Sequence, residues 1–392
     1  MAQITLRGVG HTYIHAVHES AWALNPLDLV WEDGRTYALL GPSGCGKTTM
    51  LNIISGLVRP TRGRVLFDER DVTDLPTARR NIAQVFQFPV IYGAMSVYDN
   101  LAFPLVCRKW PRQRIARKVA EIAEVLDLGR ELGRPARALT AAEKQLISLG
   151  RGLVREDVAA LLMDEPLTVI DPQFKFLLRR KIKEITERFR LTVVYVTHDQ
   201  NEAMTFADEV VVMNEGRVVQ RGSPEELFEY PRTTYVGYFI GSPAMNLFPA
   251  ATGGDALVVG GTKLRSHYDP ARLPPGQIQV GLRPEYLELA VEPGENTLPA
   301  RVTGILDQGS VRVIALEVAG HPAKASVARG RELPAGEVLV RLPAEKIRVF
   351  VDGELAEAHL WARSGDRPSA GTAPRGFAPG DGPLLESRPV AE

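Results

Sequence analysis

A glycine-rich segment that directly follows a short apolar run limits most strongly what this chain can fold into. The run, residues 36–40, predicts a buried strand, and Gly41–Thr48 then matches the phosphate-loop pattern G-x-x-x-x-G-K-[ST]. Glycines let successive backbone N–H groups surround phosphate oxygens, and the next helix adds the positive end of its dipole. A glycine-rich turn that matches by chance is the alternative for the pattern alone. The residues expected to bind phosphate are Gly41, Pro42, Ser43, Gly44, Cys45, Gly46, Lys47, Thr48 and Thr49.

Composition excludes several other classes of protein. The chain has 392 residues, enough for two or three domains, and its 47 Lys and Arg residues equal its 47 Asp and Glu residues. Without a net positive charge there is no general attraction for nucleic acid. Only two cysteines and no basic-then-apolar signal pattern at the N-terminus indicate a cytoplasmic protein. No apolar run approaches the roughly 18 residues of a membrane span, so membrane attachment would need a partner.

Strands and helices alternate along the first part of the chain, which predicts an α/β fold with a mostly parallel sheet. A helical insert spans about residues 98–153, where apolar residues recur at intervals of three and four. We expect strands at 63–68, 159–163, 192–197 and 209–213, and helices at 50–57, 172–189 and 201–206.

From about residue 247 to residue 351 the pattern changes to short valine-rich segments separated by Gly and Pro, which predicts a small all-β domain. The tail from about residue 364 is rich in Gly, Pro, Ser and charge and is expected to be disordered. The candidate strands of the second domain are 256–264, 277–282, 300–306, 311–318 and 337–342.

Two adjacent carboxylates, Asp164 and Glu165, end an apolar run that begins at Leu161. A charge at the end of a buried strand is costly unless a cation or substrate is present. We expect Asp164 to hold Mg²⁺ through water, with the Thr48 hydroxyl as a second ligand, and Glu165 to act as the general base on the attacking water. The alternative is an ordinary acidic helix cap.

A histidine, His198, stands at the end of another apolar run, residues 194–197. A single histidine is more often a structural hydrogen-bonding residue than a catalytic one, but at this place it could contact the γ-phosphate.

Together these residues, from Ile4 to Val351, resemble the nucleotide-binding subunits of ABC transporters. The resemblance implies ATP and Mg²⁺ as ligands, a RecA-like core with an antiparallel β subdomain, and a helical subdomain at about 88–155. It also implies that Gln87 senses Mg²⁺, that Asp171 bridges a dimer, and that Tyr13 stacks on adenine. A metal site formed by the nearby His11, His15 and His18 is the alternative at Tyr13.

Two C-terminal segments, Gly241–Asn246 and Gly281–Glu285, are similar to segments of the importer ATPases for maltose and glycerol phosphate. The resemblance implies an importer with an OB-like regulatory domain, transmembrane permease subunits, an indirect link to a periplasmic solute-binding protein, and a place on the cytoplasmic face of the inner membrane. The expected division is a nucleotide-binding domain at 1–238, the regulatory domain at 239–352 and an extension at 353–392.

The segment aligned with the family signature Leu-Ser-Gly-Gly-Gln departs from it. Here both glycines are alanines, and a glutamate replaces the glutamine. One interpretation is that the added methyl groups and negative charge weaken the approach to a partner's ATP. The other is that the alanines are tolerated in helical backbone, and both interpretations stay open. The expected dimer-interface residues are Leu139, Thr140, Ala141, Ala142, Glu143, Gln145 and Asp171.

The stretches 139–155 and 165–172 resemble one ATPase subunit of bacterial glycerol importers, a family in which two different ATPase subunits pair. The resemblance implies glycerol as the solute and a heterodimer.

An unusually apolar loop, Phe88–Met95, predicts a groove for a permease helix, with burial in the helical insert as the alternative. Two other functions are considered for the whole chain. One is a soluble ABC-type ATPase that acts on a non-membrane partner, and the other is a nucleotide-binding regulator with little turnover.

Overall fold

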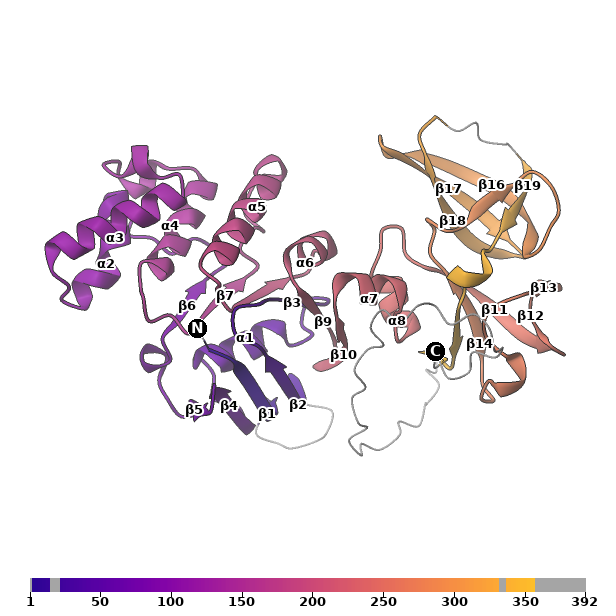
Figure 1. Ribbon diagram of the computed structural model, residues 1–392, viewed down its shortest axis with the longest axis horizontal. Coiled ribbons are helices and arrows are strands. Elements are labelled where there is room, and N and C mark those ends of the chain that lie inside the picture. The colour runs from indigo at the N-terminus through magenta and orange to yellow at the C-terminus, as the bar shows by residue number, and fades with distance from the viewer. Residues whose placement is uncertain (1, 15–21, 331–335, 357–392) are drawn as a thin grey trace.

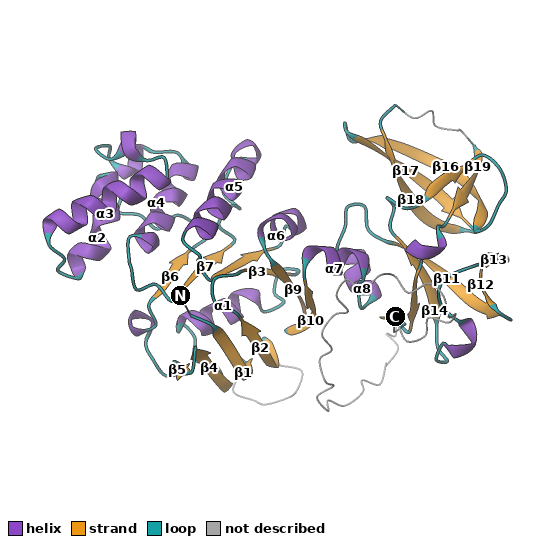
Figure 2. Cartoon of the chain, viewed as in Figure 1, coloured by secondary structure: helices purple, strands orange, loops and turns teal. Residues whose placement is uncertain are grey.

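The computed structural model describes residues 2–14, 22–330 and 336–356. Figure 1 shows an N-terminal part that mixes helices with strands and a C-terminal part built from strands, at opposite ends of the long axis. Figure 2 shows that the helices longer than one or two turns all lie in the N-terminal part. The structure therefore confirms the predicted fold class, an α/β domain followed by an all-β domain. The predicted disordered tail, from about residue 364, lies outside the described residues.

A six-stranded sheet forms the centre of the N-terminal part. Five of its strands are parallel, and the edge strand β10 is antiparallel to β9. Its middle strands are apolar and buried along their length, as expected for a sheet covered on both faces. In spatial order the strands are β10 (Arg217–Gly222), β9 (Glu209–Asn214), β3 (Thr36–Leu40), β8 (Val193–Thr197), β7 (Ala160–Asp164) and β6 (Ile82–Val85).

A second sheet, with four antiparallel strands, belongs to the same domain and packs against the same apolar core. Its strands, in spatial order, are β2 (Leu24–Trp31), β1 (Ile4–His11), β4 (Arg62–Phe67) and β5 (Arg70–Asp71). Helix α1 (Lys47–Ser55) shares one apolar core with both sheets through Met50, Leu51 and Ile54. This core fixes the helix that follows the glycine-rich loop against the end of β3.

Helix α1 begins three residues earlier than the predicted 50–57. Gly46 adopts a positive φ and forms the N-cap, and Gly56, also at positive φ, ends the helix. The glycines of the loop, rather than the first apolar residue, therefore set the helix start.

The predicted helical insert consists of three helices that pack on one another beside α5 (Figure 1). Their inward residues belong to the same apolar core as β7 and β8. The helices of the N-terminal part after α1 are α2 (Val97–Cys107), α3 (Arg112–Val125), α4 (Ala141–Leu153), α5 (Pro172–Arg188), α6 (Gln200–Phe206), α7 (Pro224–Glu229) and α8 (Thr234–Phe239).

The C-terminal part contains two antiparallel sheets around a single apolar core. The first, in spatial order, has β13 (Thr262–Leu264), β12 (Ala256–Val259), β11 (Asn246–Gly253), β14 (Ile278–Leu282), β20 (Arg348–Val351) and β21 (Glu354–Leu355). The second has β15 (Glu288–Ala290), β19 (Glu337–Arg341), β16 (Thr297–Asp307), β17 (Val311–Val318) and β18 (His321–Ala328).

The single strand predicted at 256–264 is wrong. Gly260 and Gly261 both adopt positive φ and fold this segment into the hairpin β12–β13. The prediction also missed β11, β15, β18, β20 and β21. The inward positions of β18 include Ala323 and Ala325. Small side chains pack well between sheets but give a weak strand signal in sequence.

The two parts are joined through a buried arginine, Arg283. Its guanidinium donates to the carbonyl oxygens of Phe228 and Gly237, at 2.8–3.0 Å, and to that of Ile240. Nearby, the Glu229 carboxylate accepts from Lys346 at 3.2 Å and from Tyr286. The residues that end α7 and α8 are therefore anchored on the C-terminal domain, and the predicted boundary at residue 238 falls within α8.

Candidate nucleotide site

Three neighbouring strands bring the predicted site together. Strand β8 lies between β3 and β7, and all three run parallel. The glycine-rich loop follows β3, the two carboxylates end β7, and His198 follows β8. Because the carboxyl ends of parallel strands meet at one edge of a sheet, residues more than a hundred positions apart become neighbours.

The glycine-rich loop turns sharply between β3 and α1, and its backbone requires glycine at two places. A Cβ atom at Gly41 would overlap the carbonyl oxygen of Met213 on the adjacent strand. Gly46 has a φ of 99° and a Cβ there would meet the Ala23 carbonyl oxygen. The loop therefore packs against β9 and the residues before β2, with its N–H groups at the start of α1.

The Lys47 side chain is buried and lies across this loop. Its Nζ atom donates to the carbonyl oxygens of Gly41 and Pro42, each at 2.8 Å, and lies 3.8 Å from Sγ of Cys45. Burial raises the pKa of the Cys45 thiol, which keeps it neutral beside the ammonium group. The positive charge is thus held inside the loop, where a phosphate group can reach it.

Thr48 and Asp164 connect α1 to the end of β7. The Thr48 hydroxyl donates to a carboxylate oxygen of Asp164 at 3.3 Å. Burial raises the pKa of Asp164, while this hydrogen bond acts in the opposite direction. A hydroxyl and a carboxylate at this separation are the kind of oxygen ligands that Mg²⁺ takes beside nucleotide phosphates.

Glu165 and His198 are in direct contact. Nδ1 of His198 lies 3.1 Å from Oε2 of Glu165, and the Thr168 hydroxyl donates to the same oxygen at 3.2 Å. Glu165 has a φ of 45°, a conformation that costs energy in a residue with a side chain. Its N–H donates to the carbonyl oxygen of Val196 at 2.9 Å, which holds this conformation in place. The carboxylate therefore has a fixed position beside the phosphate loop.

Tyr13 reaches the first turn of α1. Its hydroxyl lies 3.3 Å from Oγ1 of Thr49, and its ring packs edge-on against His11 with 4.5 Å between ring centroids. Tyr13 is nevertheless 61% exposed, which leaves much of the residue accessible beside the first turn of α1. The alternative to Tyr13 is a metal site formed by His11, His15 and His18, of which His15 and His18 lie outside the described residues. Within the described ranges, no group of three or more His, Cys, Asp or Glu residues could hold a metal ion.

The signature segment forms the N-terminus of α4. Thr140 is the N-cap, and the Glu143 carboxylate accepts both its N–H and its hydroxyl at 2.8 Å. The Glu143 N–H donates back to the Thr140 hydroxyl, which completes a capping box. Ala141 and Ala142 lie in the helix without positive φ, so the alanines cause no backbone strain here.

Two residues predicted at the dimer interface are placed elsewhere. Leu139 is buried in the core of the helical insert. Gln145 is also buried, one helical turn beyond the exposed start of α4, and its Nε2 atom donates to the carbonyl oxygen of Phe86 at 3.0 Å. Both side chains therefore face the interior rather than a partner. Gln145 instead supports the segment that carries Gln87, which follows the end of β6 and is half-buried. Asp171 is exposed and is the N-cap of α5.

The apolar loop after Gln87 is largely exposed. Phe88, Val90 and Tyr92 are 67%, 54% and 41% exposed, whereas Ile91 packs against the core of the helical insert. Arg151 of α4 holds the loop, with its Nη1 atom 2.6 Å from the Val90 carbonyl oxygen and its guanidinium over the Tyr92 ring. The alternative of burial is therefore wrong for Phe88, Val90 and Tyr92, which we call the 88–92 surface.

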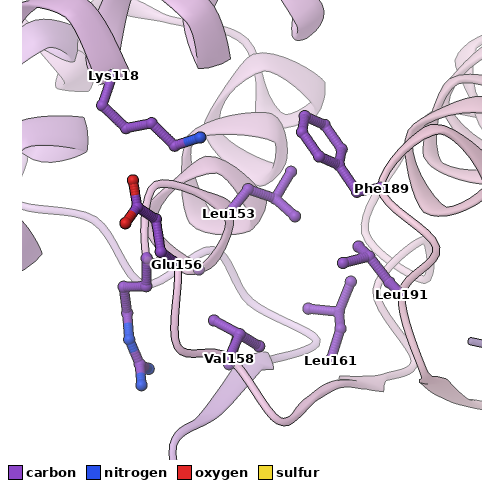
Figure 3. A pocket seen from close by; sticks show the side chains of 10 residues that line it. Lys118, Leu153, Glu156, Val158, Leu161, Phe189 and Leu191 are labelled. Carbon is purple, nitrogen blue, oxygen red and sulfur yellow. The ribbon is translucent and has the colours of Figure 1, made fainter. Parts of the chain in front are cut away.

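A separate cavity of about 190 Å³ lies between the helical insert and the C-terminal end of α5 (Figure 3). Its wall is mostly apolar, with Lys118 and Glu156 at one side (Figure 3). No predicted site residue lines it, so the cavity is not part of the nucleotide site.

Comparisons with known proteins identify the two domains of the chain. Residues 24–168 match the ABC transporter family model, and residues 280–350 match the TOBE domain model. A trehalose/maltose import ATP-binding protein of Thermococcus litoralis is 38% identical, with 88% of this chain and 98% of that protein aligned. An sn-glycerol-3-phosphate import ATP-binding protein of Cereibacter sphaeroides is 39% identical over 94% of this chain and 100% of that protein.

Among solved structures, cbiO1 of Clostridium perfringens, part of the ABC transporter complex cbiONQ, aligns with a TM-score of 0.54 at 27% identity. The alignment covers 58% of this chain and 90% of that one. The matched cassette and TOBE domain, and relatives aligned over nearly their whole length, lead to one conclusion. The chain belongs to the ABC transporter family, as one of its ATP-hydrolysing subunits.

Proposed function

We propose that this chain is the ATP-hydrolysing subunit of an importer for a carbohydrate or polyol, with glycerol as the first solute to test. The observation that supports import best is the near-complete alignment with two proteins named for the import of trehalose or maltose and of sn-glycerol 3-phosphate. The two identities are almost equal, and therefore favour neither named solute. Glycerol rests on the resemblance of residues 139–155 and 165–172 to glycerol importers.

In the proposed reaction, water attacks the γ-phosphorus of ATP and ADP leaves. Glu165 accepts a proton from the attacking water, and His198 holds the Glu165 carboxylate in position and contacts the γ-phosphate. Lys47 moves from the loop carbonyls onto the β- and γ-phosphates, because a phosphate offers the ammonium a full negative charge. Tyr13 stacks on adenine from the open side of the loop.

Magnesium is the proposed metal cofactor, held by Thr48 and Asp164 with Gln87 nearby. The hydrogen bond between Thr48 and Asp164 supports this assignment, since it already brings two suitable oxygens together. When bound, Mg²⁺ neutralises charge that develops on the phosphate oxygens.

Importer ATPase subunits of this family work with transmembrane permeases, and none of the helices in the described ranges is long and apolar enough to cross a membrane. We place the permease contact at the 88–92 surface. Three large apolar side chains are exposed there beside Gln87, and an apolar helix face can bury them. The subunit would then lie on the cytoplasmic face of the inner membrane, linked only indirectly to a periplasmic solute-binding protein.

The partner ATPase is proposed to be a different chain, so that the two nucleotide sites differ. This proposal rests on the contrast between an intact phosphate loop and a signature segment whose Thr140 hydroxyl is already bonded to Glu143.

Solute uptake tests the proposed function. A strain without this gene is supplied with labelled glycerol, sn-glycerol 3-phosphate, maltose and trehalose, and uptake is compared before and after complementation with the full-length gene. We expect one solute to require the gene, and the Glu165→Gln variant to fail to restore its uptake. Unchanged uptake of all four solutes would contradict the proposed substrate class.

A further inference from the structure

The carboxylate of Glu202 lies in the interior directly behind the nucleotide site. Glu202 is only 4% exposed, and one of its oxygens accepts the hydroxyl hydrogens of Tyr195 at 2.9 Å and Thr197 at 2.8 Å. Its other oxygen lies 3.9 Å from Nζ of Lys175. A buried carboxylate is costly unless it is paired and hydrogen-bonded, so this arrangement holds several groups in fixed positions.

The donors to Glu202 are well defined at neutral pH. Burial, with the charge of Glu202 as a further cause, raises the pKa of Tyr195 well above 10, so that its hydroxyl stays protonated and donates. Thr197 also donates to Glu202, which leaves the lone pairs of its oxygen available as acceptors.

Thr197 passes this restraint to the turn that contains His198. Its hydroxyl oxygen accepts the N–H of Asp199 at 3.0 Å. The Asp199 carboxylate in turn caps α6, accepting the N–H of Asn201 at 2.8 Å. The residues on both sides of His198 are therefore fixed to the helix that carries Glu202.

His198 itself has few restraints on its side chain. The imidazole is 54% exposed, and among the described residues its contact with Glu165 is the one polar interaction that orients it. A small rotation of the turn at 197–199 would move Nδ1 out of hydrogen-bonding range of the carboxylate, because such bonds weaken steeply with distance and angle.

We infer that Glu202 is a positioning residue of the ATPase site, acting through the Thr197 hydroxyl to hold His198 against Glu165. The inference rests on the proposed roles of His198 and Glu165. Nothing in the sequence distinguishes Glu202, since an acidic residue four positions after His198 is equally typical of an exposed helix face.

The Glu202 carboxylate also contacts the start of α5, through Lys175. Lys175 follows Asp171 by one helical turn, and its N–H donates to the Asp171 carbonyl oxygen at 3.1 Å. The pairing of Lys175 with Glu202 therefore ties the exposed turn at Asp171 to the turn at His198.

The test measures steady-state ATP hydrolysis by the assembled transporter and thermal unfolding of the full-length chain. Thr197→Val removes the bridging hydroxyl while keeping the shape of the side chain. We expect kcat to fall about tenfold with KM for MgATP unchanged, and Thr197→Ser to restore most of the activity. Thr186→Val is the matched control, because this buried threonine hydroxyl donates to the Lys183 carbonyl oxygen within α5, away from the nucleotide site. We expect it to leave kcat unchanged.

A double-mutant cycle decides whether the effect passes through His198. In a His198→Ala background, we expect Thr197→Val and Glu202→Gln to cause no further loss of kcat. An equal loss with and without His198, or a loss that Thr197→Ser does not restore, would overturn the inference while leaving the proposed function intact. Wild-type turnover in His198→Ala would instead remove His198 from the proposed mechanism, and the inference with it.

Discussion

Nδ1 of His198 lies 3.1 Å from Oε2 of Glu165, although the two residues follow different strands of the central sheet. Glu165 makes this contact from a backbone at positive φ, and the Thr168 hydroxyl donates to the same oxygen. Strain of this kind persists only where the surroundings hold it. The pair is therefore the part of the site in which small changes should have the largest effect on turnover.

The first prediction concerns Glu165. Glu165→Gln should lower kcat by at least about a hundredfold, because the amide keeps the shape of the side chain but cannot accept a proton from water. Binding of MgATP should be unchanged, and calorimetric titration measures it directly. Lys47→Ala is the contrasting variant and should weaken binding itself, since it removes the buried cation of the loop. Wild-type turnover in Glu165→Gln would exclude this residue as the general base.

The second prediction concerns the 88–92 surface. Tyr92→Glu should detach the subunit from its permease without unfolding it, because in the free subunit the carboxylate can reach water and the Arg151 guanidinium, whereas an apolar interface would bury its charge. Co-purification with the permease and thermal unfolding are the two measurements. Ile91 is a poor choice for this test, since its side chain packs against the core.

Val291→Glu provides a matched control for Tyr92→Glu. Val291 is 94% exposed on the C-terminal domain, far from the loop in sequence, and it receives the same charge. Assembly should be normal in this variant. Normal assembly and transport in Tyr92→Glu as well would place the permease contact elsewhere.

The third prediction concerns the junction between the two domains. Arg283→Leu should destabilise the protein by about 3 kcal/mol, because the carbonyl oxygens of Phe228 and Ile240 lose this buried donor and that of Gly237 keeps only the Met245 N–H. The loss of free energy of unfolding is measured by chemical denaturation and, in a separate experiment, by calorimetry. Arg301→Leu is the control: Arg301 also pairs with a neighbour, Glu317, but on the surface, and its loss should change stability little. Equal unfolding midpoints for the two variants would contradict a structural role of Arg283.

The sequence predicted the site better than its supporting contacts. The phosphate loop, the carboxylates and His198 each follow an apolar strand, and the parallel order of β3, β8 and β7 brings them together as such patterns predict. The contacts that could not be predicted are those of buried polar side chains. Gln145 and Glu202 are polar residues on helices, and nothing in their spacing distinguishes an inward position from an exposed one. The same holds for Arg283, whose partners are backbone carbonyl groups of a different domain.

The all-β domain shows the limit of strand prediction. Its valine-rich segments were identified, but β18 alternates alanines inward with Lys324 and Pro322 outward, and such a strand has little hydrophobic contrast. Its place in the sheet comes from pairing with β17 along its full length, which is a tertiary property.

The last prediction is that the two nucleotide sites of the assembled transporter differ. In this family each ATP is expected to lie between the phosphate loop of one subunit and the signature segment of the other. Here the Thr140 hydroxyl donates to Glu143, so the N-terminus of α4 presents a negative charge and an occupied hydroxyl to the partner's nucleotide. A homodimer would place this segment over both sites, whereas a different partner with an ordinary signature would complete one good site around Lys47, Asp164 and Glu165.

Variants of this chain and of its partner, together with the neighbouring genes, test this asymmetry. The neighbouring genes should include a second ATPase subunit, and this chain should co-purify with it and the permease in a single complex. Glu165→Gln in this chain should then abolish most of the ATP hydrolysis, while the equivalent change in the partner should cost much less, because in the proposed heterodimer the partner's ATP would face the Thr140–Glu143 cap. Replacing Glu143 with Gln is the sharper probe: it keeps the helix cap through the amide oxygen but removes the charge, and should raise hydrolysis at the weaker site. A homodimer of this chain that supports full transport without any second ATPase would refute the proposal, since both of its sites would then work beneath the altered signature.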